Sequence, residues 1–316
     1  MVRTVLHWTL SSIALLLAVT GVTFVLSSLA PGNAVSAVLG NDTTYTPAQY
    51  EQVKHQLGLD RSLPSQYWHW LSNLFHGSLG TDPLNGQPIT QALNARVGPS
   101  MSIIISTIVV SAILGIGIGV YSAVRGGVIG RLLDFLAVVA FALPSFWLAV
   151  VLIEIFAVEV PLFPATGYVP LTTDPAQWAR SIALPVIALS AAATAFIARQ
   201  TRDSMLRILA RDFIVALRAQ GLPTRSIVFK HALRNAAMPV VTALGLMFIA
   251  LLGGTVFVEN VFAIPGLGQQ AVNAGASHDL PLIEGVALYF AVFVIAVNLL
   301  VDLSYRVLNP RAQVAR

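Results

Sequence analysis

The stretch ALRAQGLPTRSIVFKHALRNAAMP, residues 216–239, places several basic side chains inside an otherwise apolar chain. Its middle is broken by Gly221, Leu222 and Pro223, a combination that is typical of a corner between two helices. The basic residues of the stretch are Arg218, Arg225, Lys230, His231 and Arg234. A basic segment with a built-in turn indicates a folded element that lies outside the apolar part of the protein.

The composition of the whole chain is that of a membrane protein. Of its 316 residues 56% are hydrophobic and only 10% are charged, and the mean hydropathy is +0.77. Soluble domains carry about 25% charged residues. The lack of cysteine excludes disulfides, thiolate metal sites and cysteine nucleophiles. The net charge of +4 does not indicate nucleic-acid binding, because the bases lie between apolar runs. We therefore predict an all-α integral membrane protein.

Six apolar runs approach the roughly 20 residues that a helix needs to cross a bilayer. They are residues 9–29, 99–123, 132–157, 182–198, 238–258 and 282–300. The fourth run is short and must borrow flanking residues such as Arg180 and Gln200. The first run resembles a signal peptide, but its apolar core is longer than usual, so we expect an uncleaved span.

The distribution of Lys and Arg predicts the orientation of these spans. With both termini in the cytoplasm, all but four of the 18 Lys and Arg residues lie on the cytoplasmic side, Arg3, Arg311 and Arg316 among them. The exceptions are Lys54, Arg61, Arg96 and Arg180. This topology leaves two long non-membrane segments, an outer loop at residues 30–98 and an inner loop at residues 201–237.

The inner loop is predicted to form two helices. Residues 211–220 carry Phe213, Ile214 and Leu217 at helical spacing, and Gly221 is placed to end that helix with a positive φ angle. A second helix at residues 224–235 runs into the fifth span. Because apolar faces on such a corner have no lipid to meet, we interpret it as a docking element for another protein. The alternative is an ordinary basic loop that contacts lipid phosphates.

This loop resembles the EAA coupling loop of bacterial ABC importer permeases, in the version of the peptide and nickel branch. The matching segments are DFI at 212–214, RAQGL at 218–222 and HALRNA at 231–236; of the EAA triplet only Ala216 is kept, and the loop proline comes late, at Pro239. The resemblance implies that the following residues couple the chain to an ATPase: Asp212, Phe213, Ala216, Arg218, Gly221, Leu222, Pro223, Arg225, His231, Arg234 and Asn235.

Other segments are similar to the first, or B-type, permease subunit of dipeptide and oligopeptide importers. They are LAPGNAVSAVLG at 29–40, LGLDRSLPSQYWHWLSNLFHGSLG at 57–80, VFVENVFAIPGLGQQ at 256–270 and NLLVDLSYRVLNPR at 298–311. Asn33-Ala34 replaces Asp-Pro, and Ser78 replaces an acid. The resemblance implies a type I ABC importer permease fold. Its parts would be a first span at 1–30, a scoop-like extracytoplasmic loop at 31–97, a transmembrane domain at 98–306 and a cytoplasmic tail at 307–316.

The outer loop is predicted to contain two helices of its own. Thr46-Pro47 with Gln49 starts the first and Gly58 stops it; the second runs from Pro64 to Gly77. Its apolar face consists of Tyr67, Trp70, Leu71, Leu74 and Phe75. This helix either lies on the outer leaflet, with Trp68 and Trp70 as anchors, or caps the pore mouth and receives a binding protein. Residues 86–97 are expected to lead into a span that has Pro99 in its first turn.

For the second of these readings, the residues that would contact the binding protein or form an outer gate are Tyr67, Trp70, Leu71, Glu259, Phe262, Pro265 and Gly266. Glycines and prolines in the spans would allow close approach or kinking, although ordinary helix packing explains any single one of them. They are Gly115, Gly117, Gly119, Pro144, Pro185, Gly253 and Gly254.

No catalytic or nucleotide-binding motif is present. A phosphate-binding loop needs Gly-Lys-Ser/Thr, but Lys54 follows Val53 and Lys230 follows Phe229. We predict a non-catalytic subunit without a metal site or cofactor of its own, with ATP and Mg bound by partner ATPase subunits. A self-sufficient ion-coupled carrier would need ionisable groups deep in its spans. Candidates are few: Asp134, Asp302, Glu259, Glu284, Glu159 and Glu154.

The resemblance also implies the partners. They are a second homologous permease, two ABC ATPase subunits or one fused pair, and an extracytoplasmic substrate-binding lipoprotein. Together they would import peptides across a bacterial inner membrane by alternating access. Nickel chelates or glutathione are alternative substrates of the same fold.

Overall fold

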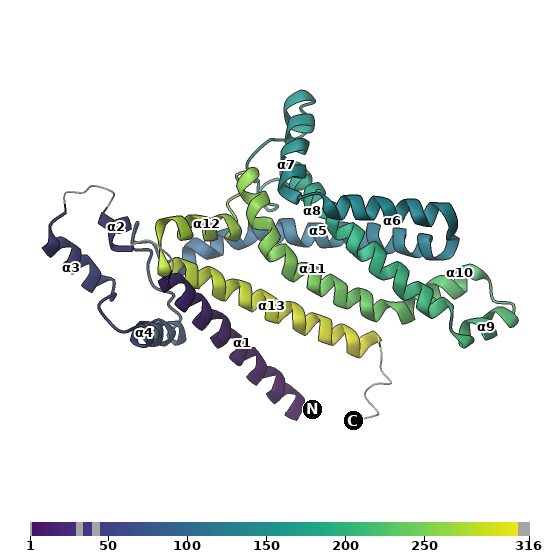
Figure 1. Cartoon of the computed structure of the whole chain (residues 1–316), viewed down its shortest axis with the longest axis horizontal. Coiled ribbons are helices and arrows are strands. Elements are labelled where there is room, and N and C mark those ends of the chain that lie inside the picture. Colours follow the sequence, from purple (N-terminus) through teal and green to yellow (C-terminus); the bar gives the residue numbers. More distant parts are fainter. Residues whose placement is uncertain (1, 30–33, 40–44, 309–316) are drawn as a thin grey trace. The chain divides into compact units, whose positions relative to one another are not determined.

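The computed structural model describes residues 2–29, 34–39 and 45–308. Within these ranges the regular structure is helical, apart from one isolated antiparallel bridge between Thr81 and Pro88. The prediction of an all-α membrane protein is confirmed (Figure 1). Most of the predicted tail at 307–316, including the Asn-Pro-Arg motif, lies outside the described residues, as do Asn33 and Met1.

The helices follow one another in this order. The first part of the chain contains α1 (Val2–Leu29), α2 (Ala34–Leu39), α3 (Pro47–Gln56), α4 (Leu63–Phe75), α5 (Ile89–Arg125), α6 (Gly127–Ala142), α7 (Ser145–Ile153) and the π-helical turn η1 (Glu154–Glu159). The second part contains α8 (Pro175–Leu209), α9 (Asp212–Ala219), α10 (Thr224–Ser226), the π-helical turn η2 (Ile227–Ala232), α11 (Leu233–Val261), α12 (Leu267–Ser277) and α13 (Leu280–Leu308).

Five helical segments of the described chain are long and apolar enough to cross a membrane. They are Trp8–Leu29, Ile89–Arg125, Pro175–Leu209, Thr224–Val261 and Leu280–Leu308. These segments contain five of the six predicted runs. The fourth run is part of a longer helix, α8, which includes Arg180 and Gln200 as predicted. This helix begins at Pro175, where Asp174 caps it by accepting hydrogen bonds from the backbone N–H groups of Ala176 and Gln177.

The predicted third span is broken at Pro144, one of the prolines that were expected to allow kinking. The chain bends by 88° between Phe135–Ala142 and Ser145–Glu159. Pro144 causes the break, because it lacks a backbone N–H and disfavours helical geometry at Leu143, whose ψ angle is 122°. The two pieces are a broken span or a re-entrant loop.

The predicted start of the second span is also wrong. We expected Pro99 in the first turn, but α5 begins at Ile89 and contains Pro99 in its interior. A proline there leaves the carbonyl of Ala95 without its usual helical partner. The helix continues because the residues before Pro99 pack into an apolar core: Ile89 and Leu93 are both fully buried.

The chain forms two compact units, each described here by itself. Unit 1 consists of residues 1–98 and 265–295, and unit 2 of residues 99–264 and 296–316. The boundary near residue 98 coincides with the predicted end of the outer loop, but unit 1 also includes α12 and most of α13.

Unit 1 has an apolar core that joins the outer loop to the start of α13. It consists of Trp70, Leu79, Ile89, Leu93, Leu267, Ala274, Leu282 and Val286. Gly285 makes this packing close, since a Cβ atom there would lie 2.8 Å from Leu93 Cδ1. The predicted helix ends in the outer loop are confirmed: Thr46 and Gln49 form a capping box, and Gly58 and Gly77 both have positive φ.

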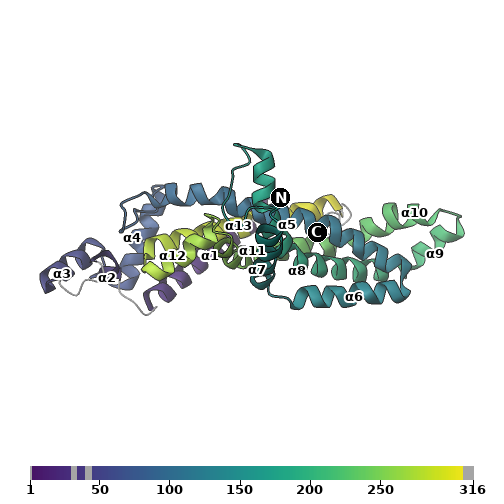
Figure 2. The same ribbon diagram turned by 90° about the horizontal axis from the view of Figure 1, so that it is seen from above.

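Unit 2 is built around α8, which packs against α6, α7 and α11. Figures 1 and 2 show α5, α6 and α8 running alongside one another in this unit. Gly115 and Gly119 allow α5 to approach α8 closely, because a Cβ atom at Gly119 would lie 2.5 Å from the carbonyl oxygen of Ala198. Gly117 has no atom within 4 Å of its Cβ direction. Helix packing is thus the role of two of the three glycines.

This contact predicts unequal effects of the same substitution at two glycines of α5. Gly119→Val should lower the free energy of unfolding by about 1–3 kcal/mol, because the added methyl groups overlap the α8 backbone. Gly117→Val is the matched control and should change stability far less, since its side chain meets open space in the chain. Thermal unfolding of both purified variants measures the difference; equal loss at both positions would contradict the contact.

Candidate functional site

The inner loop forms the helical corner that its sequence predicts. Helix α9 ends at Ala219, and Gly221 follows with a φ angle of +77°, so the predicted positive φ is confirmed. The backbone N–H of Leu222 donates to the carbonyl of Leu217 at 3.3 Å, and that of Gly221 donates to the carbonyl of Arg218 at 3.0 Å. These two bonds define a Schellman ending, which satisfies carbonyls that the helix end would leave unpaired.

Pro223 then starts the second arm of the corner. It is the N-cap of α10, and its carbonyl accepts a hydrogen bond from the N–H of Ile227 at 3.2 Å. The turn η2 has a π-helical hydrogen-bond pattern, which sequence reasoning did not predict. The segment Thr224–Val261 nevertheless continues as one span-length helix. The corner is therefore fastened directly to α11.

The inner face of the corner is packed against its own unit. Ile214 is fully buried, and Leu217 and Leu222 pack against the same cluster. The buried members of this cluster are Val120, Met205, Ile214, Ile227, Val228, Ala232 and Ala236. Part of the predicted apolar face is thus used inside the chain, where it holds both arms of the corner against α5 and α8.

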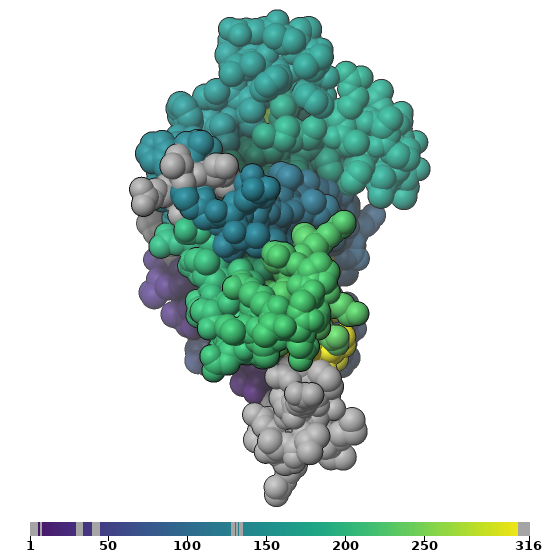
Figure 3. All heavy atoms as spheres, turned by 90° about the vertical axis from the view of Figure 1, so that its right-hand side faces the viewer, coloured from purple at the N-terminus to yellow at the C-terminus, as the bar shows by residue number. Residues whose placement is uncertain are grey.

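The outer face of the corner retains apolar side chains in the open. Phe213 is 42% exposed, and Val215 and Phe229 are each 59% exposed. Figure 3 shows this part of the chain, in green, on the face turned to the viewer. The charged residues of the corner are also exposed and form no ion pair within the described part of the chain: Asp212, Arg218, Arg225, Lys230 and Arg234.

The predicted coupling residues all lie on this corner or at its junction with α11. Most are exposed, while Leu222 and His231 are half-buried. Asn235 donates through Nδ2 to the carbonyl of His231 at 2.7 Å, which fixes its side chain along the helix. The structure therefore brings these residues together around a common turn.

The predicted outer-contact residues are mostly buried. Trp70 belongs to the core of unit 1 and stacks on Tyr67, whose hydroxyl lies 2.9 Å from Thr20 Oγ1; Leu71 packs against the same core. Glu259 is completely buried and accepts a hydrogen bond from Ser100 at 2.6 Å.

The predicted outer-contact residues in the turn after α11 are also mostly buried. Phe262 and Gly266 are buried, and Pro265 alone among the predicted outer-contact residues is exposed. Ala263 takes a φ angle of 50°, and the N–H of Ile264 donates to the carbonyl of Glu259. Within their own units, most residues of the set are therefore not exposed.

Sequence reasoning missed a cavity in unit 2. A space of about 710 Å³ lies among α5, α6 and α8. Its polar lining includes Ser122, Arg199, Gln200, Arg202 and Asp203. The signal available in the sequence was the run of polar residues at the end of α8, which we assigned only to the basic inner loop.

Buried carboxylates in unit 1 were also missed as a group. Asp279 and Glu284 are 2% and 1% exposed, and Asp82 is buried as well. Asp279 is the N-cap of α13, where it accepts a hydrogen bond from the N–H of Leu282 at 3.0 Å. Burial, and to a lesser extent the neighbouring Asp82, raise the pKa of Asp279 to about 7. An Asp just before Leu280-Pro281 was a readable helix-start signal.

The described residues contain no group of three or more His, Asp or Glu side chains suited to hold a metal ion. The inner loop forms a packed corner with an apolar and basic outer surface.

Comparison with known families identifies the class of protein. Residues 115–314 match the family described as the binding-protein-dependent transport system inner membrane component, and residues 1–86 match the N-terminal family of such membrane components. The first match covers more than half of the chain, so the chain belongs to this family. It is the permease subunit of an ABC importer and a multi-pass inner-membrane protein.

Individual relatives are similar over nearly their whole length. A protein of Sinorhizobium fredii named as a peptide ABC transporter permease is 34% identical over 97% of this chain and 98% of its own. A protein of Brucella abortus named as a peptide transport system permease is 35% identical over 96% of both chains. A glutathione transport system permease of Pectobacterium atrosepticum is 38% identical over 95% of both.

A solved structure shares the fold. The inward-facing MetNI methionine ABC transporter matches with a TM-score of 0.51 and 24% identity, over 66% of this chain and 94% of that chain. At this identity the likeness speaks for the fold, an ABC importer permease fold of the predicted type.

The Schellman ending predicts how Gly221 tolerates substitution. Gly221→Val should destabilise the corner by about 1–2 kcal/mol, because a β-branched residue is disfavoured at a φ of +77°. Gly221→Asn is the matched control, since asparagine adopts this conformation readily. Hydrogen exchange of the amides at 212–226 should accelerate in the first variant and stay near wild type in the second. Identical exchange in the two variants would show that the positive φ is not required.

Proposed function

We propose that this chain is one of two permease subunits in an ATP-driven importer of peptides, and that the corner at 211–235 docks into an ATPase subunit. The observation that carries the docking proposal is the exposed set of Phe213, Val215 and Phe229 on a corner whose inner side is already packed. Exposed apolar patches bordered by charge are typical of protein interfaces. In a docked complex these side chains leave water.

The corner is suited to transmit displacement. Its first arm follows α8 after only Ala210 and Arg211, and its second arm is continuous with α11. Both arms share one buried cluster, so a push on the corner moves them as one body. We propose that closure of the ATPases around bound ATP and Mg moves this corner and rocks the attached spans, which gives alternating access.

The exposed charges of the proposed docking surface are mostly positive. Arg218, Arg225, Lys230 and Arg234 are exposed, whereas Asp212 is the one acid among the coupling residues. An acidic border around an apolar cleft on the ATPase would complement this pattern and favour correct association.

Peptides are the proposed substrates because the relatives from Sinorhizobium fredii and Brucella abortus carry peptide transport in their names. The relative from Pectobacterium atrosepticum is named for glutathione, which keeps a peptide-like substrate as the common element. A second, homologous permease and an extracytoplasmic binding lipoprotein complete the proposed assembly.

We further propose that both termini face the cytoplasm and that the outer loop faces outward. The bias of Lys and Arg toward one side supports this orientation. The scoop-like loop, which contains α2, α3 and α4, would then lie where a binding protein arrives. The residues proposed for its contact or for the outer gate remain those predicted from the sequence.

This orientation can be tested because the chain has no cysteine of its own. A single cysteine at Ser72 in α4 should react with a membrane-impermeant maleimide in intact cells. A cysteine at Gln220, exposed on the corner, is the control and should react only after the membrane is opened. The reverse pattern would overturn the proposed topology.

Docking can be tested with the full complex. Phe213→Ser and Phe229→Ser should each weaken binding of the ATPase subunits about tenfold or more, because burial of a Phe side chain contributes about 1.5–3 kcal/mol. ATP-driven peptide uptake in proteoliposomes should fall in parallel.

The matched control is Phe75→Ser in α4, a side chain that is 79% exposed in unit 1. It should leave ATPase binding unchanged when no binding protein is present. Normal ATPase binding by both corner variants would refute the docking surface. Peptide uptake driven by a proton gradient in the chain without its ATPases would refute the ATP-driven function itself.

A further inference from the structure

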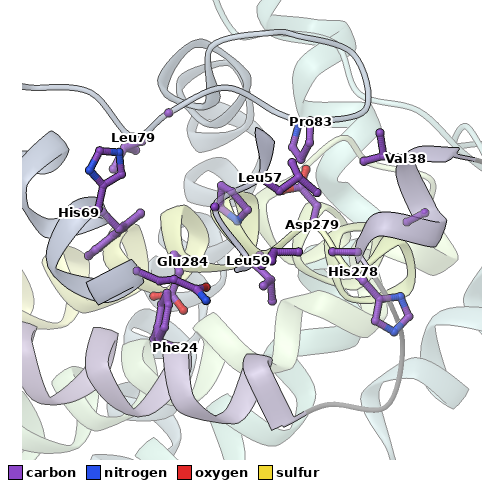
Figure 4. A pocket seen from close by; sticks show the side chains of 18 of the residues that line it. Phe24, Val38, Leu57, Leu59, His69, Leu79, Pro83, His278, Asp279 and Glu284 are labelled. Atoms are coloured by element: carbon purple, nitrogen blue, oxygen red, sulfur yellow. The ribbon is translucent and has the colours of Figure 1, made fainter. Parts of the chain in front are cut away.

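Two buried aspartates from distant parts of the chain meet in unit 1. Asp82 lies in the turn at 81–88, between α4 and α5, and Asp279 lies in the turn between α12 and α13. Their side chains are hydrogen-bonded to each other. They are 6% and 2% exposed, and both Asp279 and Pro83, the neighbour of Asp82, line a cavity of about 180 Å³ (Figure 4). The pair is therefore largely withdrawn from bulk water.

A hydrogen bond between two carboxyl groups requires a proton on one of them, since an ionised carboxylate is only an acceptor. Both oxygens of Asp82 already accept N–H groups, Oδ1 from Leu84 at 2.8 Å and Oδ2 from Nδ2 of Asn85 at 2.7 Å. Asp279 Oδ1 accepts from the N–H of Leu282 at 3.0 Å, whereas no N–H or hydroxyl donor of the described residues reaches its Oδ2. This pattern of acceptors favours a shared proton on Oδ2 of Asp279, which donates to Asp82.

Ionisation of both aspartates at once is unfavourable. Two carboxylates in contact repel each other, and burial removes the water that would stabilise the second charge. The pKa of Asp279 is raised to about 7, mainly by burial and to a lesser extent by Asp82, while the hydrogen bond from Leu282 lowers it. The folded chain thus keeps this proton over a pH range in which an aspartate in water, with a pKa of about 3.9, has lost it.

The pair lies beside the packing that joins the outer loop to α13. Leu79 and Ile89 flank the turn at 81–88. Both belong to the core of unit 1, together with Leu282 of α13. Apolar contacts thus hold the chain next to both turns, and the carboxyl pair is a polar connection between the turns themselves.

We propose that Asp82 and Asp279 form a pH-sensitive clasp, closed by one shared proton and opened when that proton is lost. In the closed state the turn at 81–88 is fastened to the start of α13; in the open state two like charges push the turns apart. Because the folded chain holds the proton more tightly than the unfolded chain, the clasp stabilises unit 1 at acidic pH, and this stabilisation is lost as the pH rises toward about 7.

In the orientation proposed above, the clasp faces outward and responds to the acidity outside the membrane. The pH response of the purified chain does not depend on that orientation, nor on which substrate the importer carries. A clasp without a pH response would therefore leave the proposed transport function untouched.

Other titratable groups line the same cavity. Arg61 comes from the segment before α4, His69 from α4, His278 from the turn between α12 and α13, and Glu284 from α13. Histidine titrates between pH 5 and 8, and Glu284 is a second buried acid, whose oxygens have no partner among the described residues. The comparison that isolates the clasp is therefore made between chains that all carry Glu284→Gln and keep the same histidines.

Hydrogen exchange of the amides at 81–88 reports on the clasp in the purified full-length chain in nanodiscs. In the Glu284→Gln chain, protection factors corrected for the intrinsic effect of pH should fall about tenfold or more between about pH 5.5 and about pH 8. Addition of Asp279→Asn should keep the turn protected at both values. Asparagine is an equally good N-cap for Leu282, and its Nδ2 donates permanently to Asp82.

Asp82→Asn tests which carboxyl group holds the proton. Asparagine has one oxygen for the two N–H donors of Leu84 and Asn85, so the turn should be less protected than in Asp279→Asn already at about pH 5.5. Asp174→Asn, at the N-cap of α8 in unit 2, is the matched control and should keep the pH response of its parent chain. Equal protection in the two clasp variants would contradict the placement of the proton on Asp279.

Infrared spectroscopy detects the proton directly, in a chain that keeps Glu284. With isotope-labelled aspartate, a labelled carbonyl band of a protonated carboxyl group should be present at about pH 5.5, should disappear by about pH 8, and should be absent from Asp279→Asn. Glu284 carries no label and does not contribute to this band. A turn at 81–88 with no pH response, an undiminished response in Asp279→Asn, or a band that survives this substitution would overturn the proposal.

Discussion

The absence of water in the hydrocarbon core governs this structure. Each backbone N–H and C=O group in a span must be paired within the protein, so the chain crosses as helix and departs from helix only at particular places. Those places are satisfied locally. At Gly221 the N–H of Leu222 returns to Leu217, and after α12 the N–H of Asp279 returns to the carbonyl of Ala274. The corner at 211–235 and the buried Asp279 both lie at such departures.

The buried acids show how the same residue type has different consequences in different surroundings. Glu259 is completely buried, and its carboxyl group accepts a hydrogen bond from Ser100 at 2.6 Å. Glu284 is equally buried, and neither of its side-chain oxygens has a partner in the described chain. One buried acid is thus paired within the described chain, and the other is not. Burial alone would not have separated them.

The corner at 211–235 is packed on its inner side and leaves apolar side chains exposed on its outer side. Ile214 and its neighbours fasten the corner to α5 and α8, and the Schellman ending fixes the angle at Gly221. Phe213 and Phe229 remain outside this packing. This combination is the basis of the proposed docking of the corner into an ATPase subunit.

The sequence by itself determined the membrane class, most of the spans, the helix ends in both loops and the positive φ of Gly221, because hydropathy and capping act over a few neighbouring residues. It misplaced the start of α5, and it named Pro144 only as one of several possible kinks, since packing decides whether a helix tolerates a proline. Only the tertiary structure showed that Trp70 is core rather than surface, and that Asp82, Asp279 and Glu284 share one unit. Burial and partner atoms come from residues far apart in the chain, and local patterns do not encode them.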